Sequence, residues 1–405
     1  MDDATQIAAW TAAIGLALPV YAYAAYPLIL FILAAFVQTG RDAYYLLFRK
    51  ERRRRARLRP RVSVIIAAHN EEAVIERTLR RCLAVDYPRD RMEILVGSDG
   101  SSDRTVDIAR QFEGEGVRVL AFTERRGKVS VVSDCVAEAR GDILVFSDAN
   151  TLIQPDAINM LVRHFMDPVI GVVCGELRFV QPDGLPRDEG LYWRYEQTLK
   201  VLESRLDSVL GANGALYAMR RDLFGRLPSN CVTDDFVIPM RVRAQGFRVI
   251  YDPEAVAEED APVGVSDEFR RRIRIGSGNW QALIWCAGLL APWQGFVSLS
   301  FWSHKVLRWF TPFSLGAGLL ANMCLLSNTF WQWVFGLQVA FYVSAAMGGI
   351  LRRFGRSPGP LGLAHYFSVI NLALGIGMVK GLFGVRRGTW KRTARGKTTP
   401  AEGAE

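Results

Sequence analysis

Two oxygen-bearing side chains follow a short apolar run and could bind a hard cation. Asp148 and Asn150 come after residues 143–146, Ile-Leu-Val-Phe. This run predicts a buried strand, and open α/β sheets bind ligands at the carboxyl ends of their strands. A carboxylate and an amide oxygen at positions i and i+2 suit Mg²⁺ or Mn²⁺, which also take phosphate oxygens as ligands. The alternative interpretation is a plain turn.

Two further predicted strands end in polar residues. Residues 62–68 lead to His69-Asn70-Glu71, and residues 92–97 lead to Asp99. Apolar strands alternate here with helical stretches, which is typical of a mainly parallel sheet covered by helices. Because parallel strands end at one rim, we expect these residues and Asp148 to share a ligand site. Asn70 is also placed to cap a helix predicted over residues 71–85. The sequence contains neither G-x-G-x-x-G nor G-x-x-x-x-G-K-[ST], which argues against the two commonest nucleotide folds.

The amino-terminal part predicts a membrane anchor. Residues 7–37 carry no charged side chain. This uncharged stretch is longer than the ~20 residues needed to span a bilayer. The start Met1-Asp2-Asp3 is unlike a positively charged signal peptide, so we interpret the segment as uncleaved, with Pro19 and Pro27 as candidate kinks. The basic block at residues 49–61 then predicts a cytoplasmic domain by the positive-inside rule. That block and the basic tail after residue 385 supply much of the net charge of +9, which therefore says little about the substrate.

The six cysteines agree with a reducing compartment. They stand singly, without a C-x-x-C pair, and the four histidines are not spaced as zinc ligands. We expect buried free thiols.

The region from residue 62 to about 280 resembles an inverting family-2 glycosyltransferase with the GT-A fold, of the membrane-embedded polysaccharide-synthase type that includes hyaluronan, cellulose and poly-N-acetylglucosamine synthases. The motifs occur in the family's order over more than half the chain. They are Ala68-His69-Asn70-Glu71, Asp99-Gly100-Ser101-Ser102-Asp103, Arg126-Gly127-Lys128, Ser147-Asp148-Ala149-Asn150-Thr151, Gly211-Ala212-Asn213-Gly214, Thr233-Asp234-Asp235 and the basic run at residues 270–274.

The resemblance implies a role for each motif at the nucleotide sugar. Asp99 would accept a hydrogen bond from the base, and Ala68, Asn70 and Glu71 would lie against the nucleoside. Lys128 would reach the base or the phosphates, or would be a solvated lysine at a helix start. The implied cofactor is Mg²⁺ or Mn²⁺, held by Asp148 with Asn150. The family usually has a second aspartate at position 150, so the amide either weakens this cation site or leaves that ligand position to a water.

The resemblance also implies the catalytic residues. Asp235, beside Asp234, would be the general base for the acceptor hydroxyl, giving a direct displacement with inversion; otherwise the pair complements a helix dipole. Arg271, Arg272 and Arg274 would neutralise the leaving nucleotide.

The acceptor side departs from the processive relatives. Their Gln-x-x-Arg-Trp signature keeps only its arginine here, as Arg274, which makes polymerisation doubtful. Trp280 could substitute for the tryptophan, or pack in an interface. Gly211, Ala212 and Asn213 match the acceptor-side loop, and residues 189–207 read as an amphipathic helix with aromatics near an acceptor channel.

The expected organisation is an α/β GT-A domain with helical membrane segments. It comprises an anchor at 1–40, a basic linker at 41–61, the GT-A domain at 62–265, interfacial helices at 266–308, membrane helices at 309–385 and a basic, then disordered, tail at 386–405. Spans near 310–326, 331–351 and 361–382 would leave the basic tail outside. Either residues 282–300 also cross, or the last segment, with Asn371, is re-entrant or lines a channel.

The expected function is transfer from a UDP-sugar to a polysaccharide or lipid-linked acceptor, by a multi-pass protein of the inner or plasma membrane whose catalytic domain is cytoplasmic. Lipids are expected partners and nucleic acid is not. Transfer could be processive, with polymer translocation, or could make a single glycolipid. From other classes, a transporter or a non-catalytic binding subunit remains as an alternative.

Overall fold

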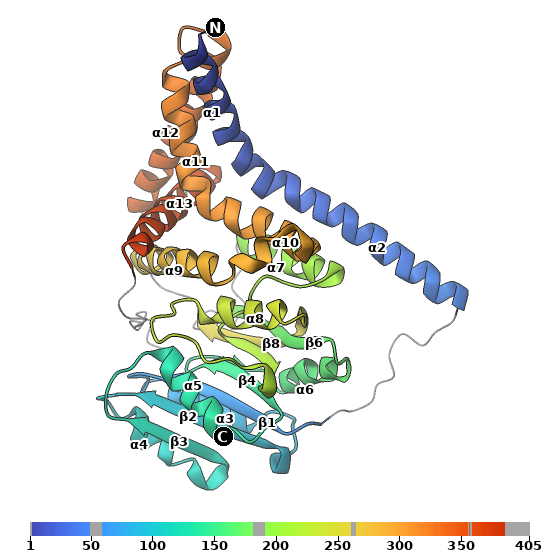
Figure 1. The fold of residues 1–405 in the computed structure, drawn as a ribbon. Helices are drawn as coiled ribbons and strands as arrows, with labels where there is room; N and C mark the ends of the chain where they lie inside the picture. Colours follow the sequence, from blue (N-terminus) through green and yellow to red (C-terminus); the bar gives the residue numbers. More distant parts are fainter. Residues whose placement is uncertain are drawn as a thin grey trace.

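The computed structural model describes residues 2–48, 59–180, 191–260, 265–354, 356 and 359–384. An α/β domain lies at the bottom of Figure 1, and a group of long helices stands above it. The basic block at 49–58, the start of the predicted amphipathic helix at 189–190 and the tail from 385 lie outside the described residues.

One mixed sheet of eight strands forms the centre of the domain, in the order β3-β2-β1-β4-β7-β6-β8-β5. β1 pairs in parallel with β2 and β4, whereas β7 is antiparallel to β4 and β6. The predicted α/β class is confirmed, and the ends of β2, β1 and β4 do lie side by side on one rim. The strands are β1 Val62–Ala68, β2 Met92–Asp99, β3 Val117–Phe122, β4 Ile143–Asp148, β5 Leu152–Ile153, β6 Ile170–Val180, β7 Leu216–Arg220 and β8 Arg248–Asp260.

Helices cover both faces of the sheet. β1 is buried along its whole length, with Val64 in the core that contains α3 and Ile65 in the core that contains α5. This burial on both faces explains why the parallel strands read as continuous apolar runs. The helices here are α3 Ile75–Leu83, α4 Thr105–Arg110, α5 Lys128–Glu138 and α6 Ala157–Val162.

The predicted cap at Asn70 is wrong. α3 begins four residues later than predicted, at Ile75, and its first turn has no side-chain cap. Asn70 instead adopts a left-handed backbone conformation, with φ 56°, and its side-chain oxygen accepts from the backbone N–H of Ser102 at 2.8 Å. It therefore ties the end of β1 to the loop after β2.

A layer of helices separates the sheet from the long apolar helices (Figure 1). α7 and α9 lie in this layer, and α8 begins beneath it. The helices of this layer, and those that lead from it to the long apolar helices, are α7 Leu191–Leu206, α8 Asp234–Ala244, α9 Val265–Trp285, the 3₁₀ turns Ala287–Leu290 and Pro292–Gln294, α10 Phe296–Ser300, a π-helical segment Phe301–Val306 and α11 Leu307–Met323.

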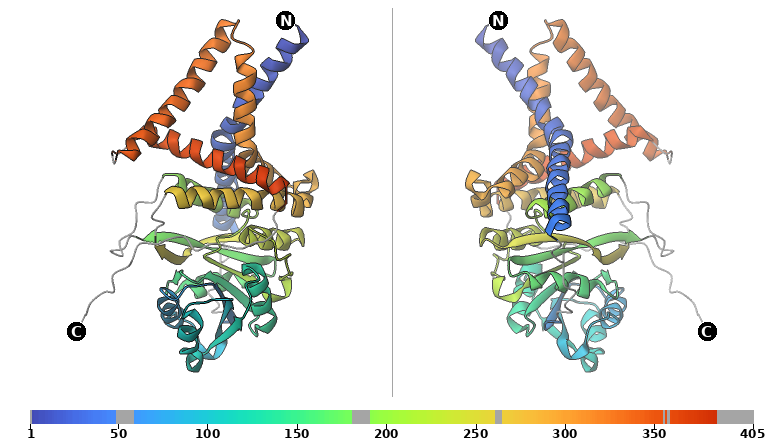
Figure 2. Two further views of the ribbon diagram at one scale, coloured as in Figure 1. Left: turned by 90° about the vertical axis from the view of Figure 1, so that its left-hand side faces the viewer. Right: turned by 90° about the vertical axis from the view of Figure 1, so that its right-hand side faces the viewer.

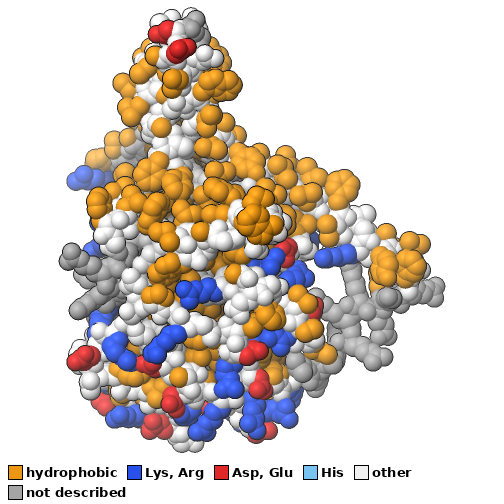
Figure 3. Space-filling view, viewed as in Figure 1, with side chains coloured by type: hydrophobic (Ala, Val, Ile, Leu, Met, Phe, Trp, Pro, Cys, Tyr) orange, Lys and Arg blue, Asp and Glu red, His pale blue; other side chains and the backbone are white. Residues whose placement is uncertain are grey.

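Three helices among the described residues are long and apolar enough to cross a membrane, and they indicate a membrane location. The first, Asp3–Phe48, consists of α1 Asp3–Val20, a π-helical segment Tyr21–Ala25 and α2 Tyr26–Phe48. The others are α12 Thr329–Arg353 and α13 Pro360–Leu382. Hydrophobic side chains dominate this end of the molecule, and charged ones the other (Figure 3).

Two of these helices deviate from simple parallel spans. The π-helical segment starts two residues after Pro19, and α1 meets α2 at a bend there (Figure 2). Prolines and π-helical turns are known causes of such kinks in helices. α13 runs back across α9 (Figure 2). Glycines allow this close crossing, since a Cβ at Gly276 or Gly377 would come within 2.6 or 2.3 Å of a carbonyl oxygen of the other helix.

The cysteines are all free thiols, as predicted. Five are buried, and Cys324 is exposed.

Candidate active site

A cavity of about 940 Å³ lies between the sheet domain and the helices α7, α9 and α13. Most of the residues singled out in the sequence line it, although they are spread over two hundred positions of the chain. They are Glu71, Lys128, Asp148, Asn150, Ala212, Asn213, Asp234, Asp235, Arg271, Arg272 and Arg274.

Three other candidates from the donor side lie outside the cavity lining. Ala68 and Asp99 are fully buried. The carboxylate of Asp99 accepts from the backbone N–H groups of Arg126, at 2.6 Å, and Gly127, at 2.9 Å. Asp99 thereby holds the loop that leads into α5, and its contact with the base stays a prediction. Asn70 is engaged by Ser102, as described above.

Two acceptor-side candidates also lie outside the lining. Gly211 packs against the ring of Phe236, where an added Cβ would lie 2.8 Å from a ring carbon. Trp280 makes an edge contact with Phe310, with ring centroids 6.5 Å apart, and packs against Gly381 of α13. Trp280 therefore belongs to the α9–α13 interface, the packing role weighed in the sequence, and Gly211 supports the loop from behind.

The predicted cation ligand Asp148, at the end of β4, binds a lysine. The ammonium of Lys128 lies 2.6 Å from Oδ1 of Asp148 and 3.9 Å from Oδ2 of Asp234. Burial favours the neutral amine, but the two carboxylates outweigh burial and raise the pKa of Lys128 above its ordinary value. Lys128 is thus a fixed positive charge among the acidic groups, and the solvated alternative does not apply.

Asp235 occupies the first turn of α8 and faces Asp148 across a glycine. A Cβ built at Gly214 would lie 3.6 Å from Oδ2 of each aspartate. The backbone N–H of Ala212 donates to the carbonyl oxygen of Asp235 at 2.8 Å, which fixes this loop against α8.

The surroundings of Asp235 favour its neutral form. Burial is the largest cause, followed by the charge of Asp234, and together they raise the pKa of Asp235 to about 6, against the opposing effect of Lys128. A carboxyl group with such a pKa is a competent general base near neutral pH.

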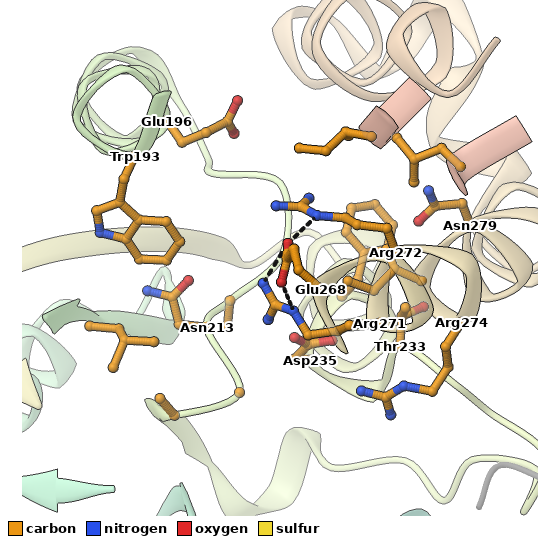
Figure 4. Close-up of a pocket in the computed structure, with 18 of the residues that line it drawn as sticks. Trp193, Glu196, Asn213, Thr233, Asp235, Glu268, Arg271, Arg272, Arg274 and Asn279 are labelled. Atoms are coloured by element: carbon orange, nitrogen blue, oxygen red, sulfur yellow. Dashed lines mark hydrogen bonds and ion pairs between the residues drawn. The ribbon is translucent and has the colours of Figure 1, made fainter. Parts of the chain in front are cut away.

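The three arginines of α9 differ in their pairing. Arg271 and Arg272 both bind Glu268, with closest N···O distances of 2.9 and 2.6 Å. Arg274 is exposed, its guanidinium makes no hydrogen bond or ion pair with a described residue, and it points away from the other two (Figure 4). The site thus holds one arginine that is already available to an anion and two that must exchange a carboxylate for it.

The donor set fits a cation that takes most of its ligands from elsewhere. Asp148 supplies one carboxylate and Asn150 one amide oxygen to the cavity. The described residues contain no group of three His, Cys, Asp or Glu side chains that could hold a metal ion. Mg²⁺ and Mn²⁺ accept such sparse protein ligands where substrate phosphates and water complete the shell.

Glu268 and α13 were missed in the sequence. Glu268 lies three and four residues before the two arginines that it binds, a helical spacing that could have revealed it. The α13 side chains Tyr366, Phe367 and Asn371 line the cavity, so this weakly apolar helix covers the site. The only related prediction was that the last apolar segment, with Asn371, is re-entrant or lines a channel.

Comparison with known proteins gives a family for this region. The family described as "Glycosyltransferase like family 2" matches residues 60–278. The probable glycosyltransferase YdaM of Bacillus subtilis (strain 168) is 30% identical over 243 residues, covering 54% of this chain and 55% of that protein. The poly-beta-1,6-N-acetyl-D-glucosamine synthase of Staphylococcus aureus (strain COL) is 24% identical over 237 residues, 55% of each. The chain spans about half the length of these curated relatives.

A solved structure shares the fold over nearly the whole chain. The mannosyltransferase PcManGT from Pyrobaculum calidifontis, determined in complex with GDP-Man and Mn²⁺, matches with a TM-score of 0.67 and 23% identity. The match covers 92% of this chain and 99% of that one, so it includes long helices as well as the sheet domain.

Proposed function

The chain belongs to the glycosyltransferase-like family 2, and from this premise we propose that it transfers a sugar from a nucleotide sugar to an acceptor hydroxyl, with inversion at the anomeric carbon. One observation carries the proposal. Carboxylates at the ends of β4 and α8 line the same cavity as the arginines of α9. Transfer from a nucleotide sugar needs this combination. A carboxylate acts as the general base that takes the proton from the acceptor hydroxyl, and cations neutralise the leaving diphosphate.

Asp235 is the proposed general base. Its carboxylate takes the proton of the acceptor hydroxyl as the oxygen bonds to the anomeric carbon, and the bond from that carbon to the diphosphate breaks. Gly214 leaves room between Asp148 and Asp235 for the reacting atoms. Asp234 assists by its charge, since among the neighbouring charges it does most to raise the pKa of Asp235.

The diphosphate would be held by several cations. Arg274 is available at once, and Arg271 and Arg272 follow when they release Glu268. Lys128, which contacts Asp148, is a further cation of the same cavity. Asp148 and Asn150 are the proposed ligands of a divalent cation, which would neutralise charge on the departing nucleotide when bound.

The donor and the acceptor belong to the proposal as well. We expect a UDP-hexose or a UDP-N-acetylhexosamine, although the PcManGT structure contains GDP-Man. The acceptor would be lipid-linked or a polysaccharide. The chain lacks the glutamine and tryptophan of the processive signature at residues 271 and 275, which favours a single transfer. Product length distinguishes the two, since a polymerase gives a ladder or smear and a single transfer gives one lipid-soluble product.

A donor screen tests the function. The purified full-length protein is incubated with Mn²⁺ and radiolabelled UDP-sugars or GDP-mannose, and nucleotide release is measured. Release from at least one donor is expected, with loss in Asp235→Asn. Absence of release and transfer from every donor would instead favour a transporter or a non-catalytic subunit.

A further inference from the structure

The cavity continues past the carboxylates toward the apolar helices. Its far end, here called the membrane end, is formed by the π-helical segments at Tyr21–Ala25 and Phe301–Val306 together with α7, α11 and α13. The acidic and basic side chains that line it are those of Glu196, Lys200, His304, Lys305 and Arg308. Figure 4 shows Glu196 extending from α7, across the cavity from Arg271 and Arg272 of α9. None of the roles proposed above uses this end.

Glu196 is the only carboxylate that described residues of α7, α11 and the π-helical segments contribute to the lining, and it is already paired. Its Oε1 accepts from Arg308 at 2.5 Å, and its Oε2 lies 3.2 Å from Nε2 of His304. Burial would raise the pKa of Glu196, but His304 and Arg308 lower it well below its ordinary value. Glu196 is therefore ionised, and Arg308 is the cation in direct contact with it.

Two lysines at the membrane end make no direct hydrogen bond or ion pair with a carboxylate of the described residues. Lys305 is half-buried, lines the cavity and makes no hydrogen bond or ion pair with a described residue. Lys200 donates to the neutral side chain of Asn213, and its ammonium lies 5.6 Å from the ring centroid of Tyr251. Burial lowers the pKa of Lys305, and the charges of Glu196 and Glu203 oppose this effect without a hydrogen bond to the ammonium. A phosphate that reaches the ammonium supplies the missing hydrogen bonds and so offsets the cost of its partial desolvation.

We propose that Lys305 and Lys200 form a subsite for an anionic group of the acceptor, a phosphate monoester or diester, while the acceptor hydroxyl lies at Asp235. The inference rests on the proposed function, because it names the chemistry of the second substrate. The arginines of α9 and Lys128 serve the donor diphosphate, so the two lysines are the cations that remain for a second anion in the same cavity.

The surroundings of the subsite suit an acceptor with an apolar part. Tyr23, Tyr195 and Phe367 line the membrane end, and Ile370 and Leu374 of α13 continue the apolar wall. A phosphate on a lipid and a phosphate on a soluble acceptor share the same chemistry at the lysines. The two acceptors differ in their apolar part, because only the hydrocarbon chain of a lipid would add affinity by packing along this wall.

A binding experiment tests the subsite without knowledge of the acceptor. The full-length protein in dodecyl maltoside is saturated with Mn²⁺ and the nucleoside diphosphate selected by the donor screen, so that the donor end is occupied. Decyl phosphate and inorganic phosphate are titrated separately, and binding is followed by tryptophan fluorescence, because Trp193 and Trp309 line the cavity. Lys305→Met and Lys200→Met should each weaken binding about tenfold or more, the effect of losing one charge-assisted hydrogen bond. Lys305→Arg should retain most of it.

Lys380→Met is the matched control, since Lys380 is exposed on α13 and does not line the cavity. Unchanged binding of the nucleoside diphosphate checks the fold of every variant. Preference for decyl phosphate supports a lipid acceptor, and equal binding of both probes supports a soluble phosphorylated one. Wild-type affinity in Lys305→Met, an equal loss in Lys380→Met, or no binding of either probe to the nucleotide-loaded protein overturns the subsite. Failure of the native protein to bind any nucleoside diphosphate would instead count against the proposed function.

Discussion

The ammonium of Lys128 lies 2.6 Å from the Asp148 carboxylate that is proposed to bind a divalent cation. A metal ion must therefore compete with a positive charge that the protein already holds there. The same ammonium is 3.9 Å from Asp234 and lowers the pKa of Asp235. Lys128 thus links the cation site to the general base.

Lys128→Met should increase the affinity for Mn²⁺ measured without nucleotide, because Asp148 is released and one positive charge is removed. About tenfold is expected from one charge at a few ångströms in a partly solvated site. Electron paramagnetic resonance of free Mn²⁺ measures this directly. Lys128→Arg keeps the charge and serves as the control. Equal Mn²⁺ affinity in Lys128→Met and the wild type would contradict the competition.

Asp235→Asn should reduce transfer by a factor of roughly 10² to 10⁴, the contribution of a positioned general base, and leave nucleotide affinity nearly unchanged. The carboxylate touches the acceptor proton and not the nucleotide. Rates of nucleotide release and equilibrium binding of the nucleotide separate the two effects. Asp107→Asn, at an exposed position on α4, is the matched control. Full activity in Asp235→Asn would assign the base elsewhere.

The same substitution should stabilise the protein at pH 7. Asp235 has its pKa raised from 3.8 to about 6 in the folded chain. The folded state then binds the proton more tightly than the unfolded state, so stability falls as pH rises from about 4 to about 6, and the loss persists above that range. The neutral asparagine avoids this cost. A higher apparent Tm is expected for Asp235→Asn at pH 7, with the difference vanishing near pH 4. A lower Tm of Asp235→Asn at pH 7 would show that the ionised carboxylate of Asp235 does not destabilise the folded protein.

The transfer rate should fall as pH drops through about 6, because only the deprotonated Asp235 can accept the proton. Lys128→Met should move this inflection to higher pH, since Lys128 is the largest of the groups that lower the pKa of Asp235. The measurement is kcat/KM for the donor between pH 5 and 8. An unshifted inflection in Lys128→Met would mean that another group controls the profile.

The sequence predicted the parallel half of the fold well for a physical reason. Strands buried on both faces, such as β1 and β4, are continuous apolar runs between clear turn signals, and their predicted limits agree with the structure within two residues. β7 and β8 were not predicted, because both depend on pairing with distant strands rather than on local pattern.

The candidate site was predicted in its residues but not in its pairings. Carboxylates at 148 and 235 do face one cavity, as the strand-end argument and the family resemblance required. The engagement of Asp99 by the backbone at 126–127, and the place of Trp280 between α9 and α13, follow from tertiary contacts that local sequence does not encode. The cover that α13 provides is likewise visible only once the chain has folded back over α9.

Glu268→Gln should tighten nucleotide binding, because Arg271 and Arg272 would no longer have to leave a carboxylate for the diphosphate. A gain of several-fold is expected, since each exchange involves a charge-assisted hydrogen bond. The same variant should have a lower apparent Tm without nucleotide, because the partly buried Arg272 loses its partner. Equilibrium nucleotide binding and thermal unfolding test the two parts. Weaker binding would mean that Glu268 positions the arginines rather than restraining them.

Two glycines of the acceptor-side loop should respond in opposite ways to alanine. At Gly214 the new Cβ lies 3.6 Å from Asp148 and Asp235, an ordinary contact, so folding should be unaffected. The methyl group nevertheless fills the space where the acceptor oxygen must approach the sugar, so transfer should fall at least tenfold for a displacement of the reacting atoms by about 1 Å. At Gly211, φ is +86° and the Cβ would lie 2.8 Å from the ring of Phe236, so Gly211→Ala should cost about 1–3 kcal/mol of stability. Thermal unfolding and transfer rates of both variants give the comparison. Loss of stability in Gly214→Ala with normal transfer by the folded fraction would show that the space beside Asp235 is structural rather than reserved for a substrate.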